Sequence, residues 1–176
     1  DPEKEITMCI NSPGGSPASG FAIYDMARFI RPPVRTIVSG LCASAAVIIF
    51  LAGEKGSRLS LPNSRFLLHQ PSAAAMGAAS DIEITAREIL NIRKVYNSIV
   101  ARETGKTVEQ VDRDANRDFW LSAEAAVEFI PSYGDPGSMM KSSAGIDTWS
   151  HDVEQIRKFP ADPRATVVLV RDGIHP

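Results

Sequence analysis

The sequence predicts an α/β fold built on a largely parallel sheet. Segments in which apolar residues alternate with polar ones, as in strands, are followed by segments with apolar residues at helical spacing. The connections between them are short. Gly, Pro, Asn and Ser mark most of the boundaries. The chain has 176 residues, which is enough for one domain with its own hydrophobic core and too few for two comfortable ones.

The chain opens with a predicted strand and helix. Alternating apolar residues predict a strand with one buried face over residues 6–10, and residues 11–15 (Asn-Ser-Pro-Gly-Gly) form a dense turn signal. Ser16 followed by Pro17 is typical of a helix N-cap and first helical position. Apolar residues at helical spacing extend this helix to about residue 30, just before two prolines.

The next segment combines a strand with an apolar helix. A second strand is expected over residues 34–39, closed by Gly40. Small residues then lead through Ser44 into an apolar helix of residues 47–52. A helix that is apolar all round is expected to be buried on all sides.

Two short strands and a long helix come next. Strands are expected over residues 58–61 and 65–69, on either side of a Pro-Asn-Ser turn. Ser80 and Glu83 match a capping box and predict the start of an amphipathic helix that runs to about residue 103, before Gly105. Its predicted apolar stripe comprises Ile82, Ala86, Ile89, Ile92, Tyr96 and Ile99.

The last predicted elements are short. Thr107 and Gln110 match a second capping box, and Ser122 is an N-cap for a final helix after the apolar segment 119–121. We therefore divide the chain into a domain of residues 1–130 and a divergent tail of residues 131–176. Five prolines interrupt the tail, and a candidate strand lies at residues 166–170.

Composition excludes several classes of function. A formal net charge of −2 gives no basic surface for nucleic acid and no acidic run typical of disorder. Cys9 and Cys42 are too few for a disulfide framework and fit no metal-ligand spacing, which favours a reducing compartment. The longest apolar run, residues 43–52, is too short to cross a membrane. The charged start without an initiator Met suggests a fragment or a processed chain.

Three side chains could form a catalytic triad. Ser44 lies where a strand turns into a helix, His69 ends a short strand, and Asp118 precedes an aromatic pair. Each also has an ordinary structural interpretation: a small residue that eases packing, a hydrogen-bonded histidine, and one member of a solvated ion-pair face. The glycines at 14 and 15 fit a tight turn better than a phosphate loop, because no Lys-Ser/Thr follows them.

The combination of motifs resembles the ClpP family of serine proteases. The resemblance rests on five segments in order: ITMCINSPGG at 6–15, GLCASAA at 40–46, LPNSR with HQP at 61–71, DIEI with AREIL at 81–90, and RDFWLSA at 117–123. The separations of 25 residues from Ser44 to His69 and of 49 residues from His69 to Asp118 match those of the family. The likeness covers residues 1 to about 129.

The resemblance implies a ClpP/crotonase-like spiral of β-β-α units with a long protruding handle helix. It implies a catalytic triad of Ser44, His69 and Asp118, with backbone amides of Gly15 and Ala45 as the oxyanion hole. The residues implied to bind the substrate peptide are Pro13, Gly14, Gln70 and Pro71.

The resemblance also implies partners and a location. The expected assembly is two stacked heptameric rings, homomeric or heteromeric, that cut unfolded proteins into short peptides for protein quality control. A Clp-type AAA+ unfoldase would use the ATP, so this chain would need no cofactor and no metal. The expected location is the bacterial cytoplasm, with an organellar stroma or matrix less favoured. No nucleic acid or membrane is expected.

The sequence departs from the family at both ends. The segment that in the family builds the axial pore and part of the unfoldase docking pocket would lie before Asp1, and the residues after Phe129 do not match the family's ending. Truncation, a disrupted frame or a native extension would each account for this. Two alternatives stay open: a non-catalytic ring subunit or inactive homologue, and a crotonase-fold enzyme that acts on acyl-coenzyme A thioesters. A related peptidase with a lysine base is disfavoured because the sequence contains no membrane anchor.

Overall fold

A five-stranded sheet forms the centre of the computed structural model, which describes residues 3–130. The strands are β1 (Ile6–Ser12), β2 (Val34–Ala43), β3 (Arg58–Ser60), β4 (Arg65–Leu68) and β5 (Phe119–Ser122). Their order is β1-β2-β4-β5, and β3 also pairs with β2. All pairs are parallel except β4 with β5. The predicted α/β fold with a largely parallel sheet is thus confirmed.

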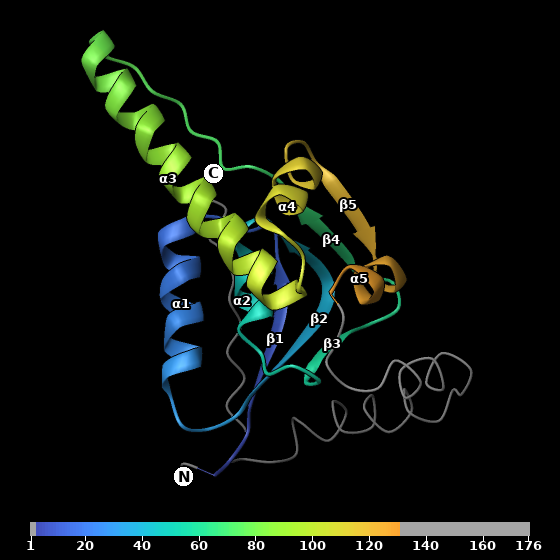
Figure 1. Ribbon diagram of the computed structural model, residues 1–176. Helices are drawn as coiled ribbons and strands as arrows, with labels where there is room; N and C mark the ends of the chain where they lie inside the picture. The colour runs from blue at the N-terminus through green and yellow to red at the C-terminus, as the bar shows by residue number, and fades with distance from the viewer. Residues whose placement is uncertain (1–2, 131–176) are drawn as a thin grey trace, which may run out of the picture.

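Five helices accompany the sheet. They are α1 (Pro17–Phe29), α2 (Ala45–Leu51), α3 (Ala79–Thr104), α4 (Val108–Asp114) and α5 (Ala123–Phe129). Figure 1 shows α2 directly over the sheet, with α1 and the C-terminal part of α3 beside it, while the N-terminal part of α3 extends far from the body. A protruding handle helix was predicted, and the structure has one.

The hydrophobic core lies between α2 and the sheet. All seven residues of α2 are buried, as expected for a helix that is apolar all round. On β1 the buried side chains are Met8, Ile10 and Ser12, so the predicted alternation with one buried face is also confirmed. Gly20 lets α1 approach α2 closely, because a Cβ there would lie 3.2 Å from the Cβ of Ala45.

The prediction that Gly40 ends the second strand is wrong. β2 continues through Gly40 to Ala43, and the register with β1 shifts between Ile10 and Ser12. Gly40 has a φ of 114°, and a Cβ there would lie 2.9 Å from Oδ1 of Asn11. Asn11 Oδ1 instead accepts a hydrogen bond of 3.0 Å from the Leu41 amide. A side chain therefore bridges the irregular step, and the strand resumes beyond the glycine.

The predicted capping box of Ser80 and Glu83 is also wrong. Helix α3 begins at Ala79, with Ala78 as its N-cap and no side-chain hydrogen bond at the cap. Ser80 is therefore already inside the helix and cannot cap it. Gly77, with a φ of 145°, precedes the cap. At the other end Gly105 adopts the left-handed conformation with a φ of 72°, as predicted for a C-cap glycine.

The remaining caps were predicted correctly. Ser16 caps α1 with Pro17 at the first turn, Thr107 and Gln110 form a complete capping box on α4, and Ser122 accepts a hydrogen bond from the Ala125 amide on α5. The tail of residues 131–176 and its candidate strand lie outside the described residues.

Candidate active site

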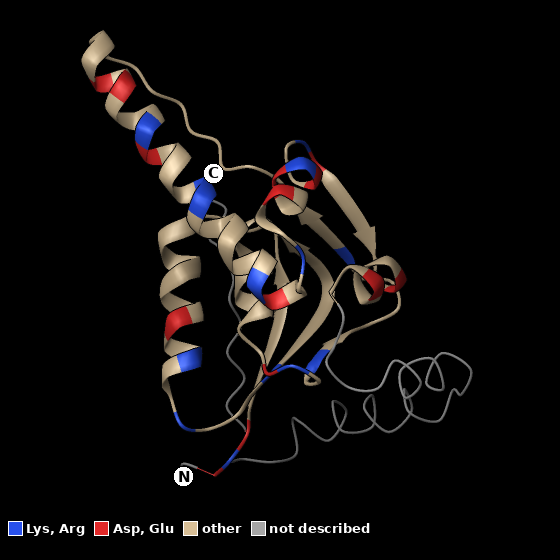
Figure 2. Ribbon diagram, in the orientation of Figure 1, with Lys and Arg blue, Asp and Glu red and all other residues tan. Residues whose placement is uncertain are grey.

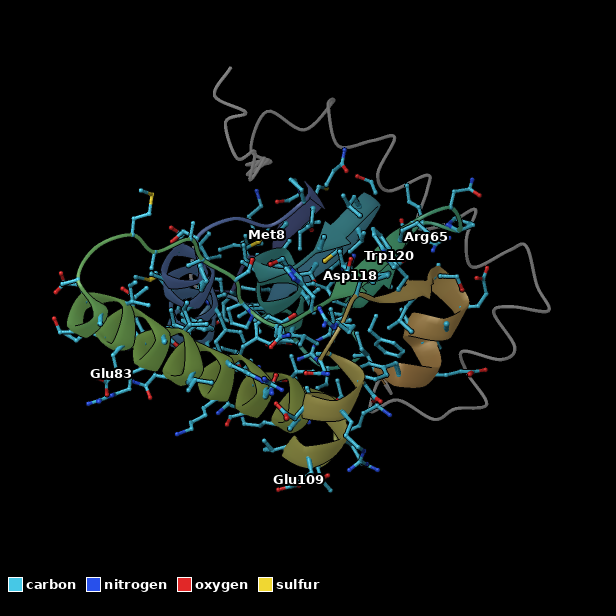
Figure 3. The ribbon with its side chains drawn as sticks, turned by 90° about the horizontal axis from the view of Figure 1, so that it is seen from above. Met8, Arg65, Glu83, Glu109, Asp118 and Trp120 are labelled. Atoms are coloured by element: carbon cyan, nitrogen blue, oxygen red, sulfur yellow. The ribbon has the colours of Figure 1, made fainter. Side chains whose placement is uncertain are left out.

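Three strand ends meet at one edge of the sheet, and each carries one residue of the predicted triad. β2 and β4 are parallel, with Ala43 paired to Leu67, so their carboxyl ends lie together and are followed by Ser44 and His69. β5 is antiparallel to β4, with Leu68 paired to Phe119, so the residue before β5, Asp118, lies at the same edge (Figure 3).

The last pair of the β4–β5 ladder, Leu68 with Phe119, lies directly next to His69 and Asp118 in the chain. Continuing the pairing of Leu68 with Phe119 by one residue places His69 across from Asp118. Residues directly opposite in an antiparallel pair have Cβ atoms about 4.5–5.5 Å apart. The four strand pairs therefore bring the segments that follow β4 and precede β5, 49 positions apart in sequence, to the same end of the sheet.

Ser44 forms a strained turn between β2 and α2. Its φ of 55° and ψ of −124° make it the one residue other than glycine with a positive φ among residues 3–130. Its amide donates a hydrogen bond of 2.8 Å to the Leu67 carbonyl. Its carbonyl accepts from the Val47 amide at 3.0 Å and from the Tyr96 hydroxyl at 3.3 Å. Strain of this kind persists where the surroundings enforce it, and it is a known feature of nucleophile turns.

The glycine loop packs against this turn. Gly14 has a φ of 99°, and a Cβ there would lie 2.6 Å from both the Ala43 carbonyl oxygen and the Ser44 Cβ. The Gly14 amide donates a hydrogen bond of 3.1 Å to the hydroxyl of the buried Ser12, which shapes the loop. Position 14 therefore requires glycine for two reasons: its backbone has a positive φ, and it lies too close to Ser44 to leave room for a side chain.

A mainly apolar pocket opens beside Ser44. Its lining residues come from α1, α2, α3 and the segment after β4: Pro17, Phe21, Ser44, Ala45, Ile48, His69, Pro71, Ile92 and Tyr96. Ser44 and His69 thus line one cavity. Such a pocket, with few polar groups, suits an apolar side chain placed next to the reacting atoms.

The three residues of the predicted triad differ in exposure. Ser44 and His69 are half-buried, whereas Asp118 is exposed. Within residues 3–130, no hydrogen bond joins Ser44 to His69 or His69 to Asp118. Hydrogen bonds between catalytic groups are often long without substrate, and they shorten in the reacting complex.

Two polar groups near the pocket remain protonated. Burial raises the pKa of the Tyr96 hydroxyl above its usual range, and the neighbouring Cys42 adds to that shift. Burial also raises the pKa of the Cys42 thiol. Tyr96 is therefore a hydrogen-bond donor to Ser44 at neutral pH, and Cys42, which is fully buried, is not available as a thiolate nucleophile.

The structure adds residues that sequence reasoning missed. Tyr96 was identified only as part of the apolar stripe, although a buried tyrosine usually needs a partner for its hydroxyl. Arg93 on α3 was not singled out, yet it donates hydrogen bonds to Gln70 at 3.0 Å and Asp112 at 2.8 Å. The side-chain amide of Gln70, predicted to contact substrate, is held by Arg93 and by the Asn116 carbonyl. No sequence pattern indicated these long-range contacts.

Two further features concern metals and membranes. The described residues contain no cluster of three or more His, Cys, Asp or Glu side chains that could hold a metal ion. No helix between residues 3 and 130 is long and apolar enough to span a bilayer.

Comparisons with known proteins identify the family and the fold. The family model described as Clp protease matches residues 1–130. A solved structure of a ClpP1 mutant from Listeria monocytogenes is similar to this chain with a TM-score of 0.67 and 42% sequence identity. The match covers 73% of this chain and 71% of that one. The chain therefore belongs to the Clp protease family, and its fold is that of ClpP.

Proposed function

We propose that this chain is a serine endopeptidase subunit in which Ser44, His69 and Asp118 form the catalytic triad. The observation that carries the proposal is the strand register, which gathers the three residues at one sheet edge from positions 25 and 49 residues apart. The strained conformation of Ser44 and the glycine packed against it support a nucleophile role, because a serine used only for packing needs neither.

In this mechanism the Ser44 hydroxyl attacks the scissile carbonyl of a peptide. His69 removes the hydroxyl proton as the bond forms and later donates it to the leaving amine, while Asp118 orients the imidazole and stabilises its charged form. The amides of Gly15 and Ala45 would stabilise the oxyanion. Ala45 is the first residue of α2, so its amide has no partner within the helix. A Cβ on Gly14 would lie 3.0 Å from that amide nitrogen, which shows how closely the loop approaches it.

The proposed substrate is an extended, unfolded polypeptide. It would lie as an added strand between the loop of Pro13 and Gly14 and the segment that begins at Gln70 and Pro71. One of its apolar side chains would enter the pocket beside Tyr96. No cofactor is needed for this chemistry, and ATP would be used only by a partner unfoldase of the Clp type.

The proposed assembly is a pair of stacked heptameric rings enclosing a chamber. None of residues 79–91 is buried, and Ile84 and Leu90 are 65% and 53% exposed on the protruding part of α3. Apolar side chains on an extended helix suit contact with another copy of the chain. Light scattering at increasing protein concentration tests this: a mass near fourteen subunits supports it, and a mass of one subunit at all concentrations contradicts it.

Labelling with a fluorophosphonate tests the catalytic proposal. The purified chain is incubated with the probe, and the adduct is located by mass spectrometry beside a Ser44→Ala variant. A label on Ser44 that is lost in the variant supports the triad. Asp118→Asn should keep the fold and lower the labelling rate by a factor on the order of 10⁴, as in trypsin-like proteases.

Two results would contradict the proposal. An unlabelled chain would favour a non-catalytic ring subunit, and hydrolysis of acyl-coenzyme A without peptide cleavage would favour a crotonase-type enzyme.

A further inference from the structure

A hydrogen-bonded clamp lies directly behind the proposed triad. The Gln70 side-chain amide donates to the Asn116 carbonyl at 2.9 Å, and its oxygen accepts from Arg93 Nη1 at 3.0 Å. Arg93 Nε donates to Asp112 Oδ1 at 2.8 Å, and Nη2 donates to Asn116 Oδ1 at 3.5 Å. We call Gln70, Arg93, Asp112 and Asn116 the clamp.

The partners fix the orientation of each group in the clamp. Arginine can only donate and a backbone carbonyl can only accept, so the oxygen of the Gln70 amide must face Arg93 and its nitrogen must face Asn116. Asp112 holds Arg93 in place and also accepts from Asn97 Nδ2 at 2.7 Å, one turn further along α3. The guanidinium thus uses all three nitrogens as donors in a planar fork, which lysine cannot reproduce.

The position of the clamp indicates what it holds. The ladder between β4 and β5 ends at the pair Leu68 and Phe119, and the next residues, His69 and Asp118, lie beyond it. Gln70 follows His69 directly, and Asn116 lies two residues before Asp118. The hydrogen bond from Gln70 to Asn116 therefore joins the two chain segments at the point where strand pairing has stopped.

We infer that Gln70 and Arg93 are positioning residues, which hold the segments of His69 and Asp118 at the spacing that the triad needs. This inference rests on the proposed function. Arg93 belongs to the handle helix, so the same contacts tie the orientation of α3 to the geometry of the site. The side chain of Gln70 acts on His69 through the backbone rather than on the substrate.

Labelling kinetics of the full chain test the inference. The maximal labelling rate and the half-saturating fluorophosphonate concentration are measured for the parent and for Gln70→Leu, Arg93→Met and Arg93→Lys. Arg31→Met is the matched control, since Arg31 is an exposed arginine between α1 and β2, outside the site and outside the protruding part of α3. Displacement of catalytic groups by about 1 Å can cost about 100-fold in rate.

The expected result separates rate from binding. Gln70→Leu and Arg93→Met should lower the maximal rate about 10- to 100-fold, with the half-saturating concentration within about twofold of the parent, as expected when reacting groups rather than binding are disturbed. Arg93→Lys should label faster than Arg93→Met but more slowly than the parent. The double variant Gln70→Leu/Arg93→Met should be no slower than the slower of its two single variants, because both changes break the same clamp. Arg31→Met should match the parent.

Other outcomes overturn the inference or the proposed function separately. Parental labelling by Gln70→Leu overturns the inference even if Arg93→Met fails to fold. Failure of the parent to label Ser44 overturns the proposed function instead. Crystal structures of the parent and Gln70→Leu then decide the inference: separation of His69 from Asp118 in the variant supports it, and unchanged positions overturn it.

Discussion

Two arginine–glutamate pairs, one near each end of the handle helix α3, have the same contact distance. Near the N-terminus of α3, Arg87 and Glu83 are 2.5 Å apart, and near its C-terminus Glu103 and Arg58 are also 2.5 Å apart. The first pair has side chains that are 72% and 69% exposed, and the second has side chains that are 4% and 2% exposed. The chemistry and the distance are equal, so the surroundings decide what each pair contributes.

The exposed pair lies on the part of α3 that leaves the body. Figure 2 shows charges of both signs spread along this part of the helix, and Figure 3 shows Glu83 far from Asp118. Water screens such a pair, and ordering two long side chains costs entropy, so pairs of this kind contribute little.

The buried pair joins four elements of the body. Arg58 donates to the carbonyls of Leu51 and Gly53 at the end of α2, and to the Glu103 carboxylate. The other carboxylate oxygen accepts from the Tyr24 hydroxyl on α1 at 2.5 Å. Helix α3 is therefore fixed to the body by its C-terminal half, which also carries Arg93 and Tyr96 to the candidate active site, while its N-terminal half stays exposed in the single chain.

Breaking the buried pair should have the largest effect on stability. Arg58→Met removes the buried cationic partner of the Glu103 carboxylate and leaves it with the largely exposed Arg102 at 3.6 Å. Breaking a buried pair costs about 3–5 kcal/mol. We expect a drop of that size in the free energy of unfolding, measured with urea, while Arg87→Met stays within about 0.5 kcal/mol of the parent. Equal losses of unfolding free energy in Arg58→Met and Arg87→Met would show that burial does not decide how much each ion pair contributes to stability.

Acid should weaken the buried pair selectively. Burial alone would raise the pKa of Glu103, but hydrogen bonds from Tyr24 and Arg58 outweigh it and hold the pKa below its ordinary value. A carboxyl with a lowered pKa in the folded state stabilises the fold above the unfolded-state value, and this stability is lost as the pH falls through the folded-state value.

Urea unfolding of the parent and Glu103→Gln as a function of pH measures this contribution. The difference in unfolding free energy should be largest above pH about 4.5 and should narrow at lower pH. A difference that stays constant down to pH about 3 would mean that the Glu103 carboxylate is not stabilised by its charge.

Much of the body could be predicted from sequence because local signals there agree with tertiary packing. The alternating apolar residues of β1, the wholly apolar α2 and the caps at Ser16, Thr107 and Ser122 were all predicted, since each depends on residues close in sequence. The two errors, at Gly40 and Ser80, are at boundaries. At Gly40 a contact with Asn11, 29 residues away, overrides the local turn signal.

The candidate site was predicted through motif resemblance rather than through local signals. Nothing in the neighbourhood of His69 indicates that Asp118 will lie opposite, because that depends on the register of β4 with β5. The contacts of Arg93 with Gln70 span 23 residues and have no periodicity that could predict them. The sequence therefore predicts candidate reacting groups, which stay a prediction, and misses the contacts that Arg93 makes beside them.

Removing the hydroxyl of Tyr96, in the C-terminal half of α3, should lower stability by less than Arg58→Met and by more than Glu83→Gln. Tyr96→Phe keeps the aromatic ring in the core and deletes the hydrogen bond of 3.3 Å to the Ser44 carbonyl, which still accepts from the Val47 amide. We expect a loss of about 0.5–1.5 kcal/mol in unfolding free energy and a severalfold slower labelling of Ser44. Parental values for both quantities would mean that Tyr96 only fills space beside the nucleophile.

The smallest effect is expected at the exposed pair. Glu83→Gln removes a charge that interacts with Arg87 one turn along the helix, and such pairs contribute about 0.3–0.5 kcal/mol. The difference from the parent in urea unfolding should vanish in 1 M salt, where the Debye length is about 3 Å, whereas the loss in Arg58→Met should persist because its partner is buried. A loss above about 1.5 kcal/mol for Glu83→Gln, or one that salt does not change, would mean that this pair is not screened by water, and exposure would then not explain the contrast between the two ends of the helix.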